Sequence, residues 1–311
     1  MALLEKMVMR REKVALIFAA DENFASLAKG LVLSILSQRG SDLFSLNMID
    51  IGCSPKTLQW MRSKGVNIGK FSLKKYYRNI KASTKPYQDA LFCRPFVGDI
   101  FPGYDIYVWC DSDIWIQDIK SLFTYIDIVN KDPSKVPISP LVDISYTYFY
   151  KEFSEYAGYN RIWYTDIYGA VVASTYANRA IFSAGVFAMH RNNPIWKAWA
   201  IEIASILKRQ MPSQTTSHLS EQTVLNYLLY STDCYIPVAA THNYNCHIGC
   251  AARTRKPTVH FDIPPYDDIG VIHLTCTSKF INQYIDDGLL YERGDYLGKA
   301  EIDNLRSISH C

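Results

Sequence analysis

The chain has 311 residues, of which 49% are apolar and 20% are charged, and this composition is typical of a folded protein with a large hydrophobic core. Its 33 Lys and Arg residues are nearly balanced by 30 Asp and Glu residues, so a net charge of +3 argues against a chain that binds nucleic acid. The longest clean apolar run is Val14 to Ala20, whereas a membrane-spanning helix needs about 20 residues. We therefore expect one or two domains and no transmembrane helix.

The N-terminal residues and the cysteines favour a cytoplasmic location. Charges interrupt the apolar residues of 1–13, which therefore lack the apolar centre of a secretory signal. The eight cysteines show no short repeated spacing and are expected to be reduced and buried, although an excised lumenal domain would look similar. The mixed charges of 286–311 do not predict firm membrane attachment, so at most peripheral contact with the inner membrane surface is expected.

The N-terminal residues alternate between strand and helix patterns. Residues 13–20 form an apolar run typical of a strand buried on both faces, and 23–38 carry apolar residues at helical spacing. Asp21 or Asn23 would cap this helix. A second strand is predicted at 43–51. The strand and helix order implies an α/β sheet.

A short helix and a central strand follow. Ser54 and the proline after it predict a helix start. Another helical stretch begins near Gln88 and is kinked or stopped around Pro95. The apolar residues 104–110 predict a central strand that delivers Asp111 to its carboxyl end, the edge at which open α/β sheets bind ligands.

The second half of the chain has weaker patterns. Amphipathic helices are predicted from Pro194 to Leu207 and from Leu219 to Tyr230. Between the two halves, residues 146–168 contain ten aromatic side chains without clear periodicity. Because no linker, repeat or low-complexity tract interrupts the chain, one compact domain with an irregular C-terminal half is the simplest interpretation.

Asp111-Ser112-Asp113 is the only Asp-x-Asp sequence in the chain. In an extended segment, residues i and i+2 point to the same side, so both carboxylates would face one hard cation that bridges a diphosphate. Two solvated turn carboxylates are the alternative, because the motif is short. The position after a buried strand weakens this alternative, since carboxylates near a core need a compensating ligand or hydrogen bonds.

Six blocks of the sequence stand out in order, at 18–24, Arg94, 104–113, 182–186, 220–226 and 271–279. In residue type and order they resemble the blocks of family 8 glycosyltransferases, the group of glycogenin and the bacterial lipopolysaccharide galactosyl- and glucosyltransferases. The resemblance covers roughly residues 13 to 282. It implies a metal-dependent enzyme that uses a nucleotide-sugar donor, usually uridine-linked, with Mn²⁺ or Mg²⁺ and with retention of anomeric configuration.

The resemblance also implies the fold and its division. We expect a GT-A type single domain over 13–285, with a Rossmann-like, mostly parallel central sheet flanked by helices. Its nucleotide-binding half would be 13–118, and its irregular acceptor and catalytic half would be 119–285. Residues 1–12 and 286–311 would be tails.

The metal ligands implied by the resemblance are Asp111, Asp113 and His273, with Ser112 among the donor-binding residues. A lone histidine is more often a core residue than a ligand, but His273 follows a short predicted strand and precedes a lysine at the family's spacing. The sequence departs from the family at Cys276, where the family has glycine, and at Phe280-Ile281, where it has Pro-Trp.

The same resemblance places the donor. Ala19, Asp21 and Asn23 would contact the base and ribose of UDP. Arg94 and Lys279 would neutralise the phosphates or contact the donor sugar, because a guanidinium fork and an ammonium both suit anionic oxygens. For Asp21 a helix cap, and for Arg94 a surface ion pair, are the alternatives.

The remaining implied site residues lie near the transferred sugar. Ser183 replaces the family's Asn, so the sugar preference would differ. Glu221 and Gln222 stand where the family has Asp-Gln, near the anomeric carbon, although Glu221 also fits the first turn of a helix. Asp143 resembles an acceptor-side carboxylate, and a turn residue is an equal alternative.

Together these features predict a hexosyltransferase that moves sugar from a UDP-sugar to a saccharide or glycoconjugate acceptor. The aromatic segment 146–168 would form one wall of an acceptor cleft facing the metal. Two alternatives stay open: an inverting enzyme with Asp143 or Glu221 as general base, and a non-catalytic nucleotide-sugar or glycan-binding protein.

Overall fold

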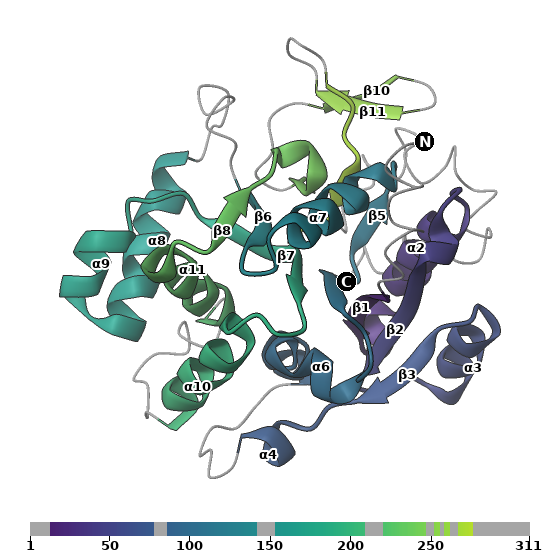
Figure 1. Cartoon of the computed structure of the whole chain (residues 1–311), viewed down its shortest axis with the longest axis horizontal. Helices are drawn as coiled ribbons and strands as arrows, with labels where there is room; N and C mark the ends of the chain where they lie inside the picture. Colours follow the sequence, from purple (N-terminus) through teal and green to yellow (C-terminus); the bar gives the residue numbers. More distant parts are fainter. Residues whose placement is uncertain are drawn as a thin grey trace.

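The computed structural model describes residues 13–77, 86–141, 153–208, 220–246, 252–255, 258–261 and 267–275 (Figure 1). Of the residues singled out from the sequence, Asp143, Cys276, Lys279 and Phe280-Ile281 lie outside these described residues, as do both predicted tails. Among the described residues, no helix combines the length and the apolar character that crossing a membrane requires.

A seven-stranded sheet forms the centre of the molecule, with the strand order β3-β2-β1-β4-β7-β6-β8. The first four strands in this order are parallel, and β7 runs antiparallel to both of its neighbours. This mostly parallel α/β sheet confirms the predicted fold class. Its strands are β1 (Val14–Ala20), β2 (Phe44–Asp50), β3 (Asn67–Lys70), β4 (Ile106–Cys110), β6 (Val136–Pro140), β7 (Phe182–His190) and β8 (Tyr235–Pro237).

Both faces of the sheet are covered by helices, which explains the continuous apolar sequence of β1. Leu16 and its alternate neighbours pack with α2 (Ala25–Leu36) and α7 (Lys120–Lys131). Ile17 and its alternate neighbours pack on the opposite face, with α10 (Ile195–Lys208) and α11 (Ser220–Thr232). Because successive side chains of a strand point to opposite faces, every residue of β1 is buried.

Capping residues and prolines in the sequence predicted the ends of several helices correctly. The Asp21 carboxylate accepts a hydrogen bond from Phe24 N at 3.0 Å and caps the first helical turn. The Ser54 hydroxyl accepts from Thr57 N and caps α3 (Pro55–Ser63). The stretch predicted to stop near Pro95 consists of three short pieces, α5 (Pro86–Phe92), η3 (Arg94–Phe96) and α6 (Val97–Ile100).

A smaller sheet and several short elements complete the described chain. A three-stranded sheet pairs β5 (Ile114–Ile116), β12 (Val271–His273) and β9 (Tyr244–Asn245), and it matters for the site below. The other elements are η1 (Glu22–Phe24), η2 (Ser41–Leu43), α4 (Leu73–Tyr76), α8 (Phe153–Tyr168), α9 (Ala170–Tyr176), η6 (Ala240–His242), β10 (Ala252–Arg255) and β11 (Thr258–Phe261).

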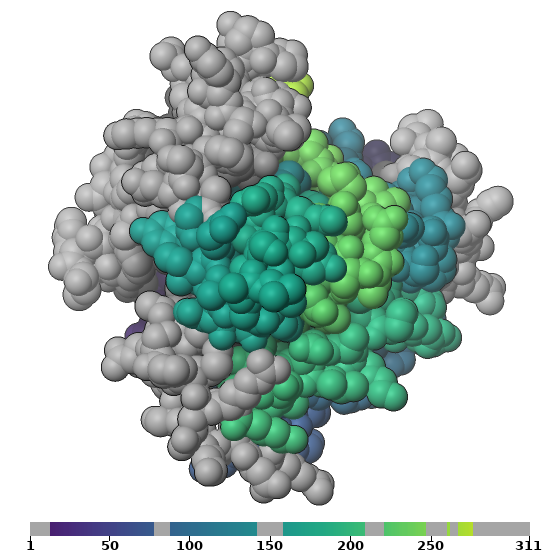
Figure 2. All heavy atoms as spheres, turned by 90° about the vertical axis from the view of Figure 1, so that its left-hand side faces the viewer, coloured from purple at the N-terminus to yellow at the C-terminus, as the bar shows by residue number. Residues whose placement is uncertain are grey.

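The described part of the aromatic segment is the helix α8, which lies with α9 on the surface shown in Figure 2. Tyr164 is buried, with its ring stacked on that of Tyr176. Tyr159 is half exposed, and its ring stacks on that of Trp163. Aromatic side chains on both the inner and outer sides of the helix explain the weak periodicity. The predicted acceptor cleft stays a prediction.

Candidate active site

The sheet topology brings the first half of the predicted site to one edge. Because β1 and β4 are parallel neighbours, Asp21 and Asp111 both follow strands that end at the carboxyl edge. β7 is antiparallel to β4, so its first residues lie at the same edge, where Asp111 N donates a hydrogen bond to Gly185 O at 2.8 Å. Residues 74 positions apart are thus in direct contact.

The three predicted metal ligands come together. His273 Nε2 lies 3.2 Å from Asp113 Oδ1 and 3.7 Å from Asp111 Oδ2. The extended geometry expected for the Asp-x-Asp motif is wrong: Ile114 N donates to Asp111 O at 3.2 Å, which closes a turn between β4 and β5. Leu274 N also donates a hydrogen bond to Asp113 O. The pairing of β12 with β5 therefore places His273 beside this turn.

The donor set fits a divalent cation. One oxygen or nitrogen from each of the three residues lies within 4.8 Å of the others. Ligands about 2.0–2.2 Å from one ion stand about 3 Å apart when they are at right angles, and the two histidine distances come close to this spacing. Carboxylate oxygens and an imidazole nitrogen are both common ligands of divalent metal ions. The Asp111 side chain keeps 25% of its surface exposed, which leaves the group open to a ligand.

Gly185 leaves room for the histidine. A Cβ atom at this position would stand 2.8 Å from His273 Nδ1, closer still to Cε1, and 3.2 Å from Asp111 Oδ2. The ring therefore packs directly on the backbone of β7. A glycine inside a strand marks such a close approach, and here the approach serves the ligand group.

Arg94 links Asp111 to Glu221, which lies at the start of α11. Its Nη2 donates to Asp111 Oδ1 at 2.6 Å, and its Nη1 donates to Glu221 Oε1 at 2.7 Å. The side chain of Arg94 is 4% exposed and that of Glu221 is 1% exposed, so the predicted alternative of a surface ion pair is wrong. Burial acts to lower the pKa of Arg94, but the two carboxylates outweigh it and the net shift is upward.

Two tryptophans that sequence reasoning missed support this ion-pair network. Trp109 Nε1 donates to Asp111 Oδ1 at 2.7 Å, and the Arg94 guanidinium lies 5.1 Å from the centre of the Trp109 ring. Trp199 Nε1 donates to the backbone oxygen of Glu221 at 2.9 Å. Asp111 Oδ1 thus receives two hydrogen bonds, while Oδ2 faces His273.

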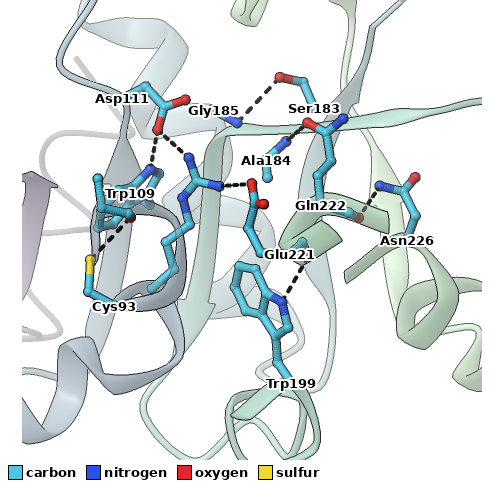
Figure 3. A network of polar contacts seen from close by, with 12 residues as sticks. Cys93, Trp109, Asp111, Ser183, Ala184, Gly185, Trp199, Glu221, Gln222 and Asn226 are labelled. Atoms are coloured by element: carbon cyan, nitrogen blue, oxygen red, sulfur yellow. Dashed lines mark hydrogen bonds and ion pairs between the residues drawn. The ribbon is translucent and has the colours of Figure 1, made fainter. Parts of the chain in front are cut away.

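The residues expected near the donor sugar are buried and bonded to the backbone. Gln222 Oε1 accepts from Ala184 N at 3.0 Å, and the Ser183 hydroxyl accepts from Gly185 N at 3.3 Å. Asn226, one turn further along α11, bonds both backbone groups of Phe182. α11 and the start of β7 therefore form one connected wall beside Asp111 (Figure 3).

The residues expected to contact UDP lie along the sheet edge. Ala19 is buried near the end of β1, whereas Asn23 is exposed and its amide donates to Asp21 Oδ2 at 3.3 Å. Ser112 is buried inside the Asp-x-Asp turn. Asp21 caps η1, so the capping alternative is confirmed, while a role in binding the base stays a prediction.

An Asp-x-Asp turn and a histidine at the carboxyl edge of a Rossmann-like sheet define a GT-A type glycosyltransferase fold. The profile of the Glycosyl transferase family 8 matches residues 15–280, and the chain belongs to this family. No curated protein sequence matches the chain.

Solved structures of low sequence identity share this fold. The bifunctional glycosyltransferase WbbM aligns with a TM-score of 0.62 at 15% identity over 96% of this chain. This chain spans only 52% of the length of WbbM. The galactosyltransferase LgtC, solved with donor and acceptor sugar analogues, gives a TM-score of 0.53 at 14% identity over 95% of both chains. Mouse xyloside xylosyltransferase 1 gives 0.51 at 12% identity, over 86% of this chain and 98% of its own.

Proposed function

We propose that the chain transfers a hexose from a UDP-sugar to a hydroxyl group of a saccharide or glycoconjugate acceptor, with retention of anomeric configuration. The observation that carries this proposal is the group of Asp111, Asp113 and His273 at the carboxyl edge of the sheet. These residues would hold Mn²⁺ or Mg²⁺, which when bound neutralises the charge of the diphosphate leaving group. Residues 13–118 would bind the nucleotide, and 119–285 would supply acceptor and catalytic groups.

In this proposal the chain's own residues orient the donor. Asp21 and Asn23 would bond the base and ribose at the end of β1. Ser112 and Lys279 would face the diphosphate, and Gln222 with Ser183 would line the donor sugar. The fixed hydrogen bonds of Gln222 and Ser183 to the backbone of β7 support a preorganised sugar site.

The described contacts argue against an inverting reaction with Glu221 as base. A general base must reach the proton that it removes, and it must be able to accept that proton near the working pH. Glu221 is almost completely buried and its Oε1 is held by the Arg94 guanidinium, so this carboxylate is poorly placed to reach an acceptor hydroxyl. Asp143, the other candidate base, lies outside the described residues, and we keep it as a proposed acceptor-side carboxylate.

The five cysteines among the described residues are free thiols. Free thiols fit a reducing compartment, and we include a cytoplasmic location in the proposal.

The test is a screen of sugar nucleotides with Mn²⁺ for slow donor hydrolysis, followed by NMR analysis of the anomeric configuration of the product. We expect hydrolysis of a UDP-sugar and loss of metal-dependent UDP binding in Asp113→Asn. Asp127→Asn, which removes a surface carboxylate paired with Lys131, is the matched control and should bind UDP normally. Tight UDP binding without turnover of any donor would support the non-catalytic alternative. Unchanged UDP binding in Asp113→Asn would contradict the metal assignment.

A further inference from the structure

Asn243 is a buried residue whose side-chain amide contacts His273 on the side of the ring away from Asp111 and Asp113. We call Asp111, Asp113 and His273 the metal-ligand group. It lies between η6 and β9, and its side chain has no exposed surface. Its Oδ1 is 3.0 Å from His273 Nδ1. The opposite ring nitrogen, Nε2, is the one that faces Asp111 and Asp113. The histidine therefore lies between the amide and the two carboxylates.

The backbone around Asn243 holds this amide in place. Asn243 N donates to Ala240 O at 3.0 Å, and its carbonyl oxygen accepts from Asn245 Nδ2 at 2.9 Å. β9 pairs with β12 so that Asn245 stands opposite His273. Because Asn243 directly precedes β9 and His273 ends β12, the pairing of these two strands holds the amide and the imidazole at a fixed separation.

The chemistry of the contact selects one tautomer of His273. A neutral imidazole carries one proton, and it can bind a cation only through the nitrogen that lacks it. A carbonyl oxygen can only accept, so Asn243 Oδ1 requires the proton on Nδ1 and leaves the Nε2 lone pair for the metal. The reverse amide orientation would place a donor against Nδ1, favour a proton on Nε2 and remove the ligand.

We propose that Asn243 is a positioning residue that holds His273 as the Nδ1–H tautomer and aims Nε2 at the metal position. Together with the Gly185 backbone, which packs against Cε1 and Nδ1, the amide fixes the ring from its back edge. A neutral amide does this without adding a third negative charge to the two carboxylates. The inference rests on the proposed metal site, so its test must separate the two.

The test measures Mn²⁺ affinity by titration calorimetry without any sugar nucleotide. Asn243→Ala should weaken Mn²⁺ binding about 10–100-fold, the usual cost of losing a group that orients a ligand. Asn243→Asp, which restores an acceptor, should bind Mn²⁺ at least about tenfold more tightly than Asn243→Ala. Asn160→Ala is the matched control: this amide is also buried, and it bonds Ala177 O in a different part of the fold. Its Mn²⁺ affinity should stay within about twofold of the unmodified protein.

Comparison with His273→Ala separates the two hypotheses. If His273→Ala loses Mn²⁺ binding while Asn243→Ala binds normally, the role of Asn243 is overturned and the metal site stands. If neither substitution changes Mn²⁺ binding, or the unmodified protein binds none, the metal site itself is wrong.

A measurement on the unmodified protein covers the case in which Asn243→Ala fails to fold. Long-range ¹H–¹⁵N NMR spectra distinguish the two imidazole tautomers, and the spectrum of His273→Ala identifies the His273 signal. We expect the Nδ1–H form. A dominant Nε2–H form would overturn the proposal.

Discussion

Replacing Gly185 by alanine tests the arrangement of the metal-ligand group most directly. The new Cβ would stand 2.8 Å from His273 Nδ1 and 3.2 Å from Asp111 Oδ2, and closer still to His273 Cε1. Comfortable contacts between such atoms are about 3.5–4.0 Å, so the ring must shift by roughly 1 Å. Metal ligands tolerate errors of only about 0.2 Å. We therefore expect Mn²⁺ affinity to fall at least about 100-fold, since the shift exceeds what loss of an orienting group alone produces.

Crowding the site should also affect stability. Overpacking a filled interior costs about 1–3 kcal/mol, which would lower the unfolding temperature by several degrees. Gly158→Ala is the matched control, because a Cβ at this position in α8 meets no atom within 4 Å. That control should keep Mn²⁺ affinity and gain up to about 1 kcal/mol, since alanine favours helices. Normal Mn²⁺ affinity and stability in Gly185→Ala would refute the packing of His273 on β7.

Three further predictions concern neighbouring groups. Trp109→Phe removes the indole hydrogen bond to Asp111 Oδ1 and should weaken Mn²⁺ binding about tenfold by calorimetry, with a normal circular dichroism spectrum; unchanged affinity would mean that Arg94 alone orients the carboxylate. Burial, reinforced by Asp50, raises the pKa of Cys53 to about 12, so its thiol stays protonated and iodoacetamide should label it at pH 8 far more slowly in the native protein than in urea. Equal labelling rates in the native and unfolded protein would contradict the burial and the raised pKa of the Cys53 thiol. Tyr159→Ala should raise the acceptor KM and leave donor hydrolysis unchanged, whereas equal loss of both activities would place the ring outside the acceptor site.

Local patterns sufficed for the parts of the fold that local interactions determine. The buried run of β1, the Asp21 and Ser54 caps and the strand before Asp111 all depend on residues close in sequence. The antiparallel position of β7 between β4 and β6 does not, because it depends on partners far away in the chain. α8 was missed as a helix because its aromatic rings lie on both its inner and outer sides, which obscures a helical period.

The candidate site also contains residues that the sequence predicted and residues that it did not. The Asp-x-Asp motif and the histidine were found from sequence, because their residue types and order resemble those of a known family. The contact between Trp109 and Asp111 could have been predicted from the sequence. Residues two positions apart on a strand point to the same side, and Trp109 stands two positions before Asp111. Nothing in the sequence pattern indicated that Asn243 contacts His273, which is 30 residues away. A two-residue strand such as β9 has no period to detect, and only its pairing with β12 gives it a position.

Glu221 shows how one residue satisfies two interpretations that the sequence left open. It lies in the first turn of α11, where a negative charge is favoured, and it also pairs with Arg94. Through Arg94 the start of α11 is bonded to Asp111, while Gln222, the next residue, is bonded to β7. A displacement of α11 would therefore disturb Asp111 and the proposed sugar site together. Because a buried guanidinium cannot keep both carboxylates if either moves, the network would couple the proposed sugar site to the geometry of the proposed metal ligands.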